Sequence, residues 1–101
     1  MKTLTGLDER LKYFENLPPE AEAKLPTYRG MVKISAGIVA SKSPEDAIDL
    51  YHIGLKFSNE GDVILEDSEF KLLKDACIKN PGNWINQFYA QLLLKIKEWE
   101  K

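Results

Sequence analysis

The segment KFSNEGDVILED, residues 56–67, has the outline of a calcium-binding loop. An EF-hand loop supplies oxygen ligands at positions 1, 3, 5, 9 and 12 and needs glycine at position 6. With Gly61 at position 6, Lys56 takes position 1, where its ammonium group would repel a cation, and Asp67 takes position 12, where the usual ligand is the longer glutamate. We therefore expect no metal here, and we expect Gly61 to turn the chain before a helix that starts with acidic residues.

Two other sets of side chains have the right chemistry for a site but lack partners. His52 is the only histidine and falls on an apolar helical face, so we expect a core or half-buried side chain. Ser68 and Lys71 match the Ser-x-x-Lys acylation motif, which is short and belongs to much larger folds. The chain has no phosphate-binding glycine loop, Cys-x-x-Cys pair or His-Glu-x-x-His motif. We predict a protein that is not an enzyme and has no catalytic residues, metal or cofactor.

The segments that carry these residues have helical spacing. Apolar residues recur at intervals of three and four over residues 27–39, 44–57, 67–79 and 83–100. Thr27 and Ser43 are suited to cap the first two of these helices, and Pro44 suits a first helical position. On the second helix, Ala47, Ile48, Tyr51 and Leu55 form the main apolar stripe, which Leu50, Ile53 and Phe57 widen. A short extended piece is possible at 62–65.

The N-terminal part admits two structures. Leu4, Leu7, Leu11 and Phe14 are spaced like a helical stripe, yet the threonines and Gly6 leave an extended start open. Three prolines make residues 17–26 a linker. We expect a single domain over 1–101, with 1–26 as N-terminal segment and proline-rich linker and 27–101 as helical core. The fold class is mainly all-α, a small bundle of four to five short helices.

Composition excludes several classes of function. The 101 residues include 14 basic and 16 acidic side chains, a net charge of -2, so non-specific nucleic-acid binding is not expected. A single cysteine, Cys77, fits a reducing compartment. The first residues are interrupted by charge within eight positions, unlike a signal peptide or a membrane span. We expect a cytoplasmic protein without membrane contact.

A helix-turn-helix over residues 67–101 is the alternative interpretation. Four amide side chains could read bases, Asn83, Asn86, Gln87 and Gln91, and three lysines could contact phosphate, Lys95, Lys97 and Lys101. The last helix is nevertheless rich in large apolar residues, which is typical of a core helix.

Five residues are candidates for partner binding. Gly30 and Gly37 lie seven apart in a helix, where each glycine costs about 1 kcal/mol relative to alanine, so a packing reason is expected. This reason is either a neighbouring helix of the same chain or a second subunit. Trp84, Tyr89 and Leu93 lie off the stripe of the last helix and make it apolar on more than one face, which the N-terminal segment or a partner could cover.

The segments LPTYRGMVKISAGIVAS and PEDAIDLYHIGLKFSNEGDVILEDSEFKLLKDACIKN together resemble a group of small uncharacterised bacteriophage and prophage proteins over about residues 25–95. That group has no activity from which functional residues could be carried over. The resemblance implies a non-catalytic accessory protein that acts in the host cytoplasm through protein–protein interaction, with self-association left open. Its partner would be a second copy or another phage or host protein.

Overall fold

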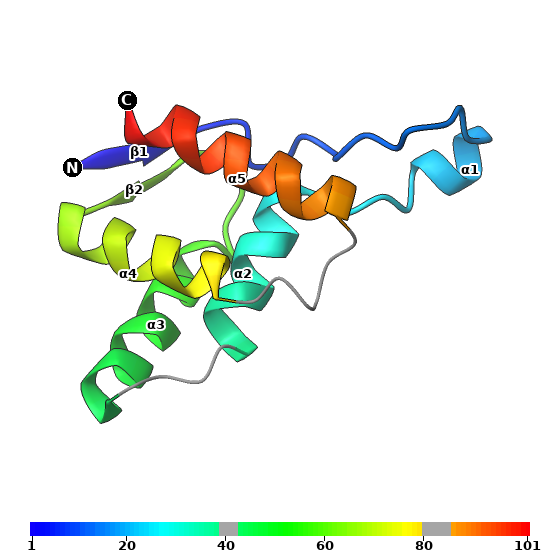
Figure 1. Cartoon of the computed structure of the whole chain (residues 1–101). Helices are drawn as coiled ribbons and strands as arrows, with labels where there is room; N and C mark the ends of the chain where they lie inside the picture. The colour runs from blue at the N-terminus through cyan, green and yellow to red at the C-terminus, as the bar shows by residue number, and fades with distance from the viewer. Residues whose placement is uncertain (39–42, 80–85) are drawn as a thin grey trace.

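The computed structural model describes residues 1–38, 43–79 and 86–101, which form five helices and two short strands (Figure 1). In chain order the elements are β1 (Lys2–Leu4), α1 (Pro19–Glu22), α2 (Tyr28–Ile38), α3 (Pro44–Lys56), β2 (Val63–Leu65), α4 (Asp67–Ile78) and α5 (Asn86–Glu100). The mainly helical fold with a short extended piece near 62–65 is therefore confirmed.

Local capping explains where three of the helices begin. The Thr27 hydroxyl accepts a hydrogen bond from the backbone N–H of Gly30 at 3.1 Å, at the start of α2. The Ser43 hydroxyl accepts one from the N–H of Asp46 at 3.2 Å, and Pro44 stands first in α3. Glu66 and Glu69 form a reciprocal capping box at the start of α4. Both caps expected from the sequence are present.

The helical alternative for residues 1–17 is wrong. Residues 2–4 form β1, which pairs antiparallel with β2 so that Leu4 lies opposite Val63, and no helix precedes α1 in the described chain. Leu4, Leu7 and Leu11 are still fully buried. Their spacing suits a helix, but the backbone of this segment forms hydrogen bonds with β2 and with side chains of α5 instead of within a helix of its own.

The N-terminal segment runs antiparallel along α5, and the two termini of the chain lie close together (Figure 1). The Trp99 indole N–H donates to the carbonyl of Thr5 at 2.9 Å. Further along, the Gln91 amide accepts from the N–H of Lys12 at 2.9 Å and donates to its carbonyl at 2.8 Å. The N–H of Phe14 then donates to Gln87 at 3.0 Å, and beyond this contact the chain leaves α5, so that α1 lies at the far end of the molecule.

One apolar core joins both strands, α2, α3, α4, α5 and the N-terminal segment. Its buried members are Leu4, Leu7, Leu11, Met31, Val32, Ala36, Leu50, Ile53, Phe57, Val63, Leu65, Phe70, Leu73, Ala76, Cys77, Leu92, Ile96 and Trp99. The stripe expected for the final helix is Ile85, Phe88, Leu92, Ile96 and Trp99; its last three members are buried, Phe88 is partly buried, and Ile85 lies outside the described residues.

Helix α3 buries the opposite face from the one that its main stripe predicts. Leu50, Ile53 and Phe57 enter the core, whereas Ile48, Tyr51 and Leu55 are 57%, 63% and 50% exposed. Because apolar residues lie on both sides of this helix, periodicity alone does not select the buried side. Packing against α2 and α4 decides it.

Candidate functional site

The loop from Phe57 to Gly61, which resembles a calcium site in sequence, is built around an arginine of the same chain. The Arg29 guanidinium donates to the carbonyl of Phe57 at 3.1 Å and to the carbonyls of Asn59 and Gly61. It also donates to both carboxylate oxygens of Asp8, at 2.7 and 3.3 Å. A cation therefore already sits among the oxygens of this loop, and it belongs to the protein.

This arrangement changes the titration of Asp8. The hydrogen bond from Arg29 lowers the pKa of this carboxyl below its ordinary value of 3.8, against a smaller opposing effect of desolvation. Gly61, with φ of +92°, provides the left-handed turn that brings its carbonyl to Arg29. No sequence motif pointed to Arg29, because its five acceptor oxygens come from two segments far from it in the sequence, Asp8 and the loop 57–61.

The residues considered for chemistry lie apart from any enclosed site. His52 is exposed beside the Tyr51 ring, so the expectation of a core or half-buried histidine is wrong. It occupies the outward face that α3 leaves unpacked. Ser68 and Lys71 are exposed on α4. Burial raises the pKa of the Cys77 thiol to about 11, which keeps it protonated and unreactive.

The described residues contain no cluster of three or more His, Cys, Asp or Glu side chains placed to hold a metal ion.

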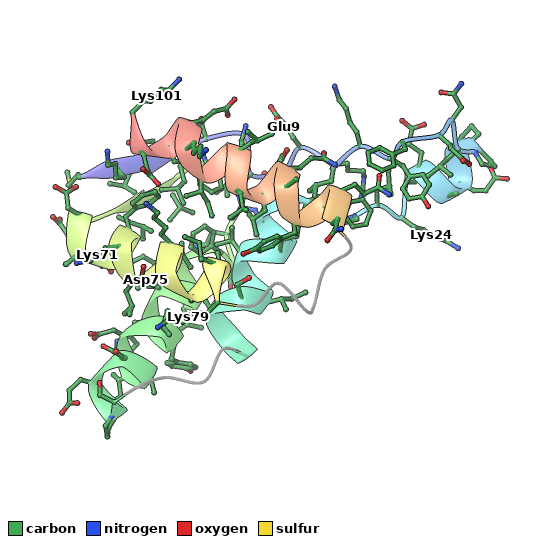
Figure 2. All side chains as sticks on the ribbon, viewed as in Figure 1. Glu9, Lys24, Lys71, Asp75, Lys79 and Lys101 are labelled. Atoms are coloured by element: carbon green, nitrogen blue, oxygen red, sulfur yellow. The ribbon has the colours of Figure 1, made fainter. Side chains whose placement is uncertain are left out.

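The polar side chains that a DNA-binding α5 would use are largely engaged within the chain. Gln87 accepts from the N–H of Phe14 at 3.0 Å, and Gln91 bonds to Lys12. Lys95 is only 12% exposed and pairs with Glu9 and Glu98, each at 3.3 Å. Figure 2 shows Glu9 beside α5. Burial alone would lower the pKa of Lys95, and the two ion pairs more than offset this, so its pKa is raised.

The two candidate glycines of α2 have different surroundings. A Cβ atom built on Gly30 would meet the Thr27 hydroxyl at 3.4 Å, and one built on Gly37 would meet nothing within 4 Å. The close approach of another helix, expected as one reason for these glycines, is not found among the described residues. Gly37 is exposed.

Of the three aromatic and apolar candidates expected in the last helix, Tyr89 and Leu93 both lie near Ile78 at the end of α4. The Tyr89 hydroxyl donates to the carbonyl of Ile78 at 2.8 Å, and so joins the end of α4 to α5. Leu93, one turn further along α5, is half-buried. Trp84 lies outside the described residues.

Leu93 lines an open groove between α4 and α5. The groove has a volume of about 450 Å³, and its walls are Lys74, Ile78, Ala90, Leu93, Leu94, Ile96, Lys97 and Glu100. Ile78 and Leu94 are 41% and 62% exposed, so its apolar wall is open to solvent. Lys74 and Glu100 form an ion pair at 2.7 Å that joins α4 to α5.

The charged side chains that line this groove are Lys74, Lys97 and Glu100. Lys97 has no ion-pair partner among the described residues. Figure 2 shows Lys71, Asp75 and Lys79 in a row along α4, and their spacing places them beside Lys74 and Ile78 on that helix. These three side chains are exposed and lie outside the lining of the groove, so Lys97 is its unpaired charge among the described residues.

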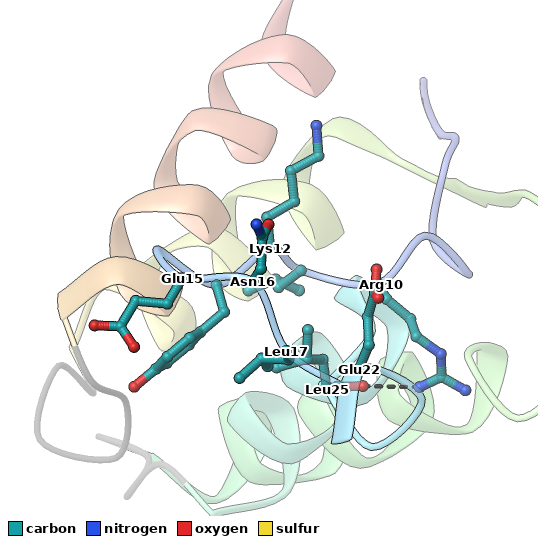
Figure 3. A pocket seen from close by; sticks show the side chains of 9 residues that line it. Arg10, Lys12, Glu15, Asn16, Leu17, Glu22 and Leu25 are labelled. Atoms are coloured by element: carbon teal, nitrogen blue, oxygen red, sulfur yellow. Dashed lines mark hydrogen bonds between the residues drawn. The ribbon is translucent and has the colours of Figure 1, made fainter. Parts of the chain in front are cut away.

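A second hollow lies in the N-terminal segment (Figure 3). Residues 10–25 curve around it, and the Arg10 guanidinium closes it by donating to the carbonyl of Leu25 at 2.8 Å. The side chains that line it are mostly exposed and include both charges, such as Lys12 and Glu15. Its lining mixes Leu11, Leu17 and Leu25 with exposed charged side chains and includes no buried polar group, so the α4–α5 groove is the better candidate for binding.

Comparison with known proteins adds no relative. No family model matches the chain, and neither a curated protein nor a solved structure is significantly similar to it. Within the described ranges, no helix has the length and apolar character that crossing a membrane requires.

Proposed function

We propose that this chain is a non-catalytic accessory protein, of the phage type that its sequence resembles, and that it acts in the host cytoplasm by binding a protein through the α4–α5 groove. The observation that carries the proposal is the exposed apolar wall of this groove, formed by Ile78, Leu93 and Leu94. Apolar surface that a folded domain leaves open in a concave site is typical of interaction surfaces.

The alternative of DNA binding receives less support. Gln87, Gln91 and Lys95 hold the N-terminal segment or carboxylates of the same chain, so they would have to exchange those partners to contact DNA. Asn86 and Lys97 stay exposed.

Site-specific photo-crosslinking tests the proposal. A photoreactive amino acid at position 94 should form an adduct with one protein in expressing bacteria, identified by mass spectrometry, and Ile78→Glu should abolish the adduct. Position 14 is the matched control, because Phe14 is 84% exposed but lies on the N-terminal segment. Adducts from position 94 that are no stronger than those from position 14 would refute the proposal.

A further inference from the structure

The exposed face of α3 has the properties of an occupant for the α4–α5 groove. Ile48, Tyr51 and Leu55 stand at positions i, i+3 and i+7, directly opposite the buried face of the helix. This is the spacing by which an amphipathic helix places anchors in a groove. Because α3 uses Leu50, Ile53 and Phe57 for the core, the outward anchors take no part in the core that the described residues form.

The charges of the two surfaces are complementary. Glu45 and Asp49 are exposed along one edge of the α3 stripe and have no ion-pair partner among the described residues. The groove offers Lys97, which has no ion-pair partner in the described chain. Opposite charges at the edges of an apolar contact favour the correct partner and disfavour pairing of like surfaces.

We propose that α3 of one copy docks into the α4–α5 groove of a second copy, so that the protein associates with itself head to tail. This inference rests on the proposed function and names its partner. The two surfaces are different, so the contact is heterologous, and each added copy leaves one free α3 stripe and one free groove. Two like stripes would instead bring Glu45 and Asp49 of both copies close together.

The contact is small. The three anchors present on the order of 300–400 Å² of surface, about half of the roughly 800 Å² per partner found in stable complexes. Affinity in the roughly micromolar to millimolar range is therefore expected. The mass of the purified protein should rise with concentration and should not stop at a dimer unless a ring closes.

Two single substitutions and their mixture test the proposal by sedimentation or light scattering of the full chain. Tyr51→Glu damages the stripe and Leu94→Glu damages the groove; each should weaken association about tenfold or more. Both side chains are more than 60% exposed, so helical content should stay intact. Phe14→Glu, on the N-terminal segment, should associate like the unmodified protein.

The mixture is decisive. Tyr51→Glu retains a good groove and Leu94→Glu retains a good stripe, so the two variants together should form a one-to-one complex although each alone is monomeric. If the mixture stays monomeric, or if the Tyr51→Glu variant associates normally, the proposal that α3 occupies the groove of a second copy is refuted.

The outcome separates this inference from the proposed function. A chain that stays monomeric at all concentrations, while position 94 still crosslinks to another protein, refutes the inference and leaves the proposed function standing. A monomer without such crosslinks refutes both. Adducts between two copies that join position 94 to residues 45–55 would support both.

Discussion

Replacement of Arg29 by methionine should be among the most destabilising single changes in this protein. Methionine keeps an unbranched apolar stem but has no donor, so the carbonyls of Phe57, Asn59 and Gly61 and the Asp8 carboxylate lose their partner. The bond to Phe57 is partly buried, whereas those to Asn59 and Gly61 are exposed. Water can replace the guanidinium at the exposed carbonyls more readily than at the carbonyl of Phe57.

The expected loss follows from these differences. A hydrogen bond to a charged group contributes about 1.5–3 kcal/mol, and this full range applies to the carbonyl of Phe57. Each exposed carbonyl adds roughly 0.5 kcal/mol, since water takes over most of its bonding. The free energy of unfolding should fall by about 2.5–4 kcal/mol, a large share of the 5–15 kcal/mol that typically stabilises a domain.

Urea unfolding followed by far-ultraviolet circular dichroism measures this loss. With a slope of about 2 kcal/mol per molar urea, the midpoint should fall by about 1–2 M. Arg29→Lys keeps the charge without the planar set of five donors and should fall in between. Lys33→Met is the control, because Lys33 is exposed on the same helix, and its change should stay within about 0.5 kcal/mol. If Arg29→Met is as stable as this control, Arg29 does not organise the loop.

Three further predictions concern the same loop and the N-terminal segment. Because its pKa is lowered, Asp8 stabilises the fold above its ordinary value of 3.8 and loses this effect as pH falls through the folded-state pKa. Asp8→Asn should therefore be less stable than the unmodified protein at neutral pH but not in acid, and a difference independent of pH would contradict this. Calcium should leave the urea midpoint unchanged, since Arg29 occupies the loop carbonyls. If calcium raised the midpoint and Asp67→Ala abolished that rise, the loop would contain a calcium site. Gln91→Ala should speed amide hydrogen exchange at Lys12 and leave exchange in α2 and α4 unchanged. Gln91→Glu keeps the acceptor for the N–H of Lys12, so its exchange rate should be intermediate. Equal exchange in all three proteins would show that Gln91 does not hold the segment.

Short-range chemistry allowed much of the helical fold to be predicted. The caps at Thr27 and Ser43 act within three residues of the chain, and so their effect can be recognised without knowing any neighbour. The stripe of Leu92, Ile96 and Trp99 is buried as expected, because the described part of α5 has these large residues at one regular spacing. The extended piece at Val63–Leu65 is likewise found where it was expected.

The candidate site depended on long-range contacts that periodicity does not encode. Tyr51 and Ile53 lie on opposite faces of a helix that is apolar on both, and only packing against α2 and α4 selects the buried face. The α4–α5 groove likewise exists only once two helices lie side by side, so Leu93 could be identified as off the stripe but not as part of a concave surface.

The sequence by itself determined where helices α2, α3 and α4 begin, that the chain is mainly helical, and that residues 56–67 lack the ligands of a calcium loop. Only the tertiary structure decided that the N-terminal leucines are buried without a helix, that α3 turns Ile48, Tyr51 and Leu55 to solvent, and that Arg29 fills the loop. The physical reason is range: a cap or a turn satisfies backbone groups a few residues away, whereas burial and the bonds of Arg29 to Asp8 and Gly61 join segments 21 and 32 residues apart.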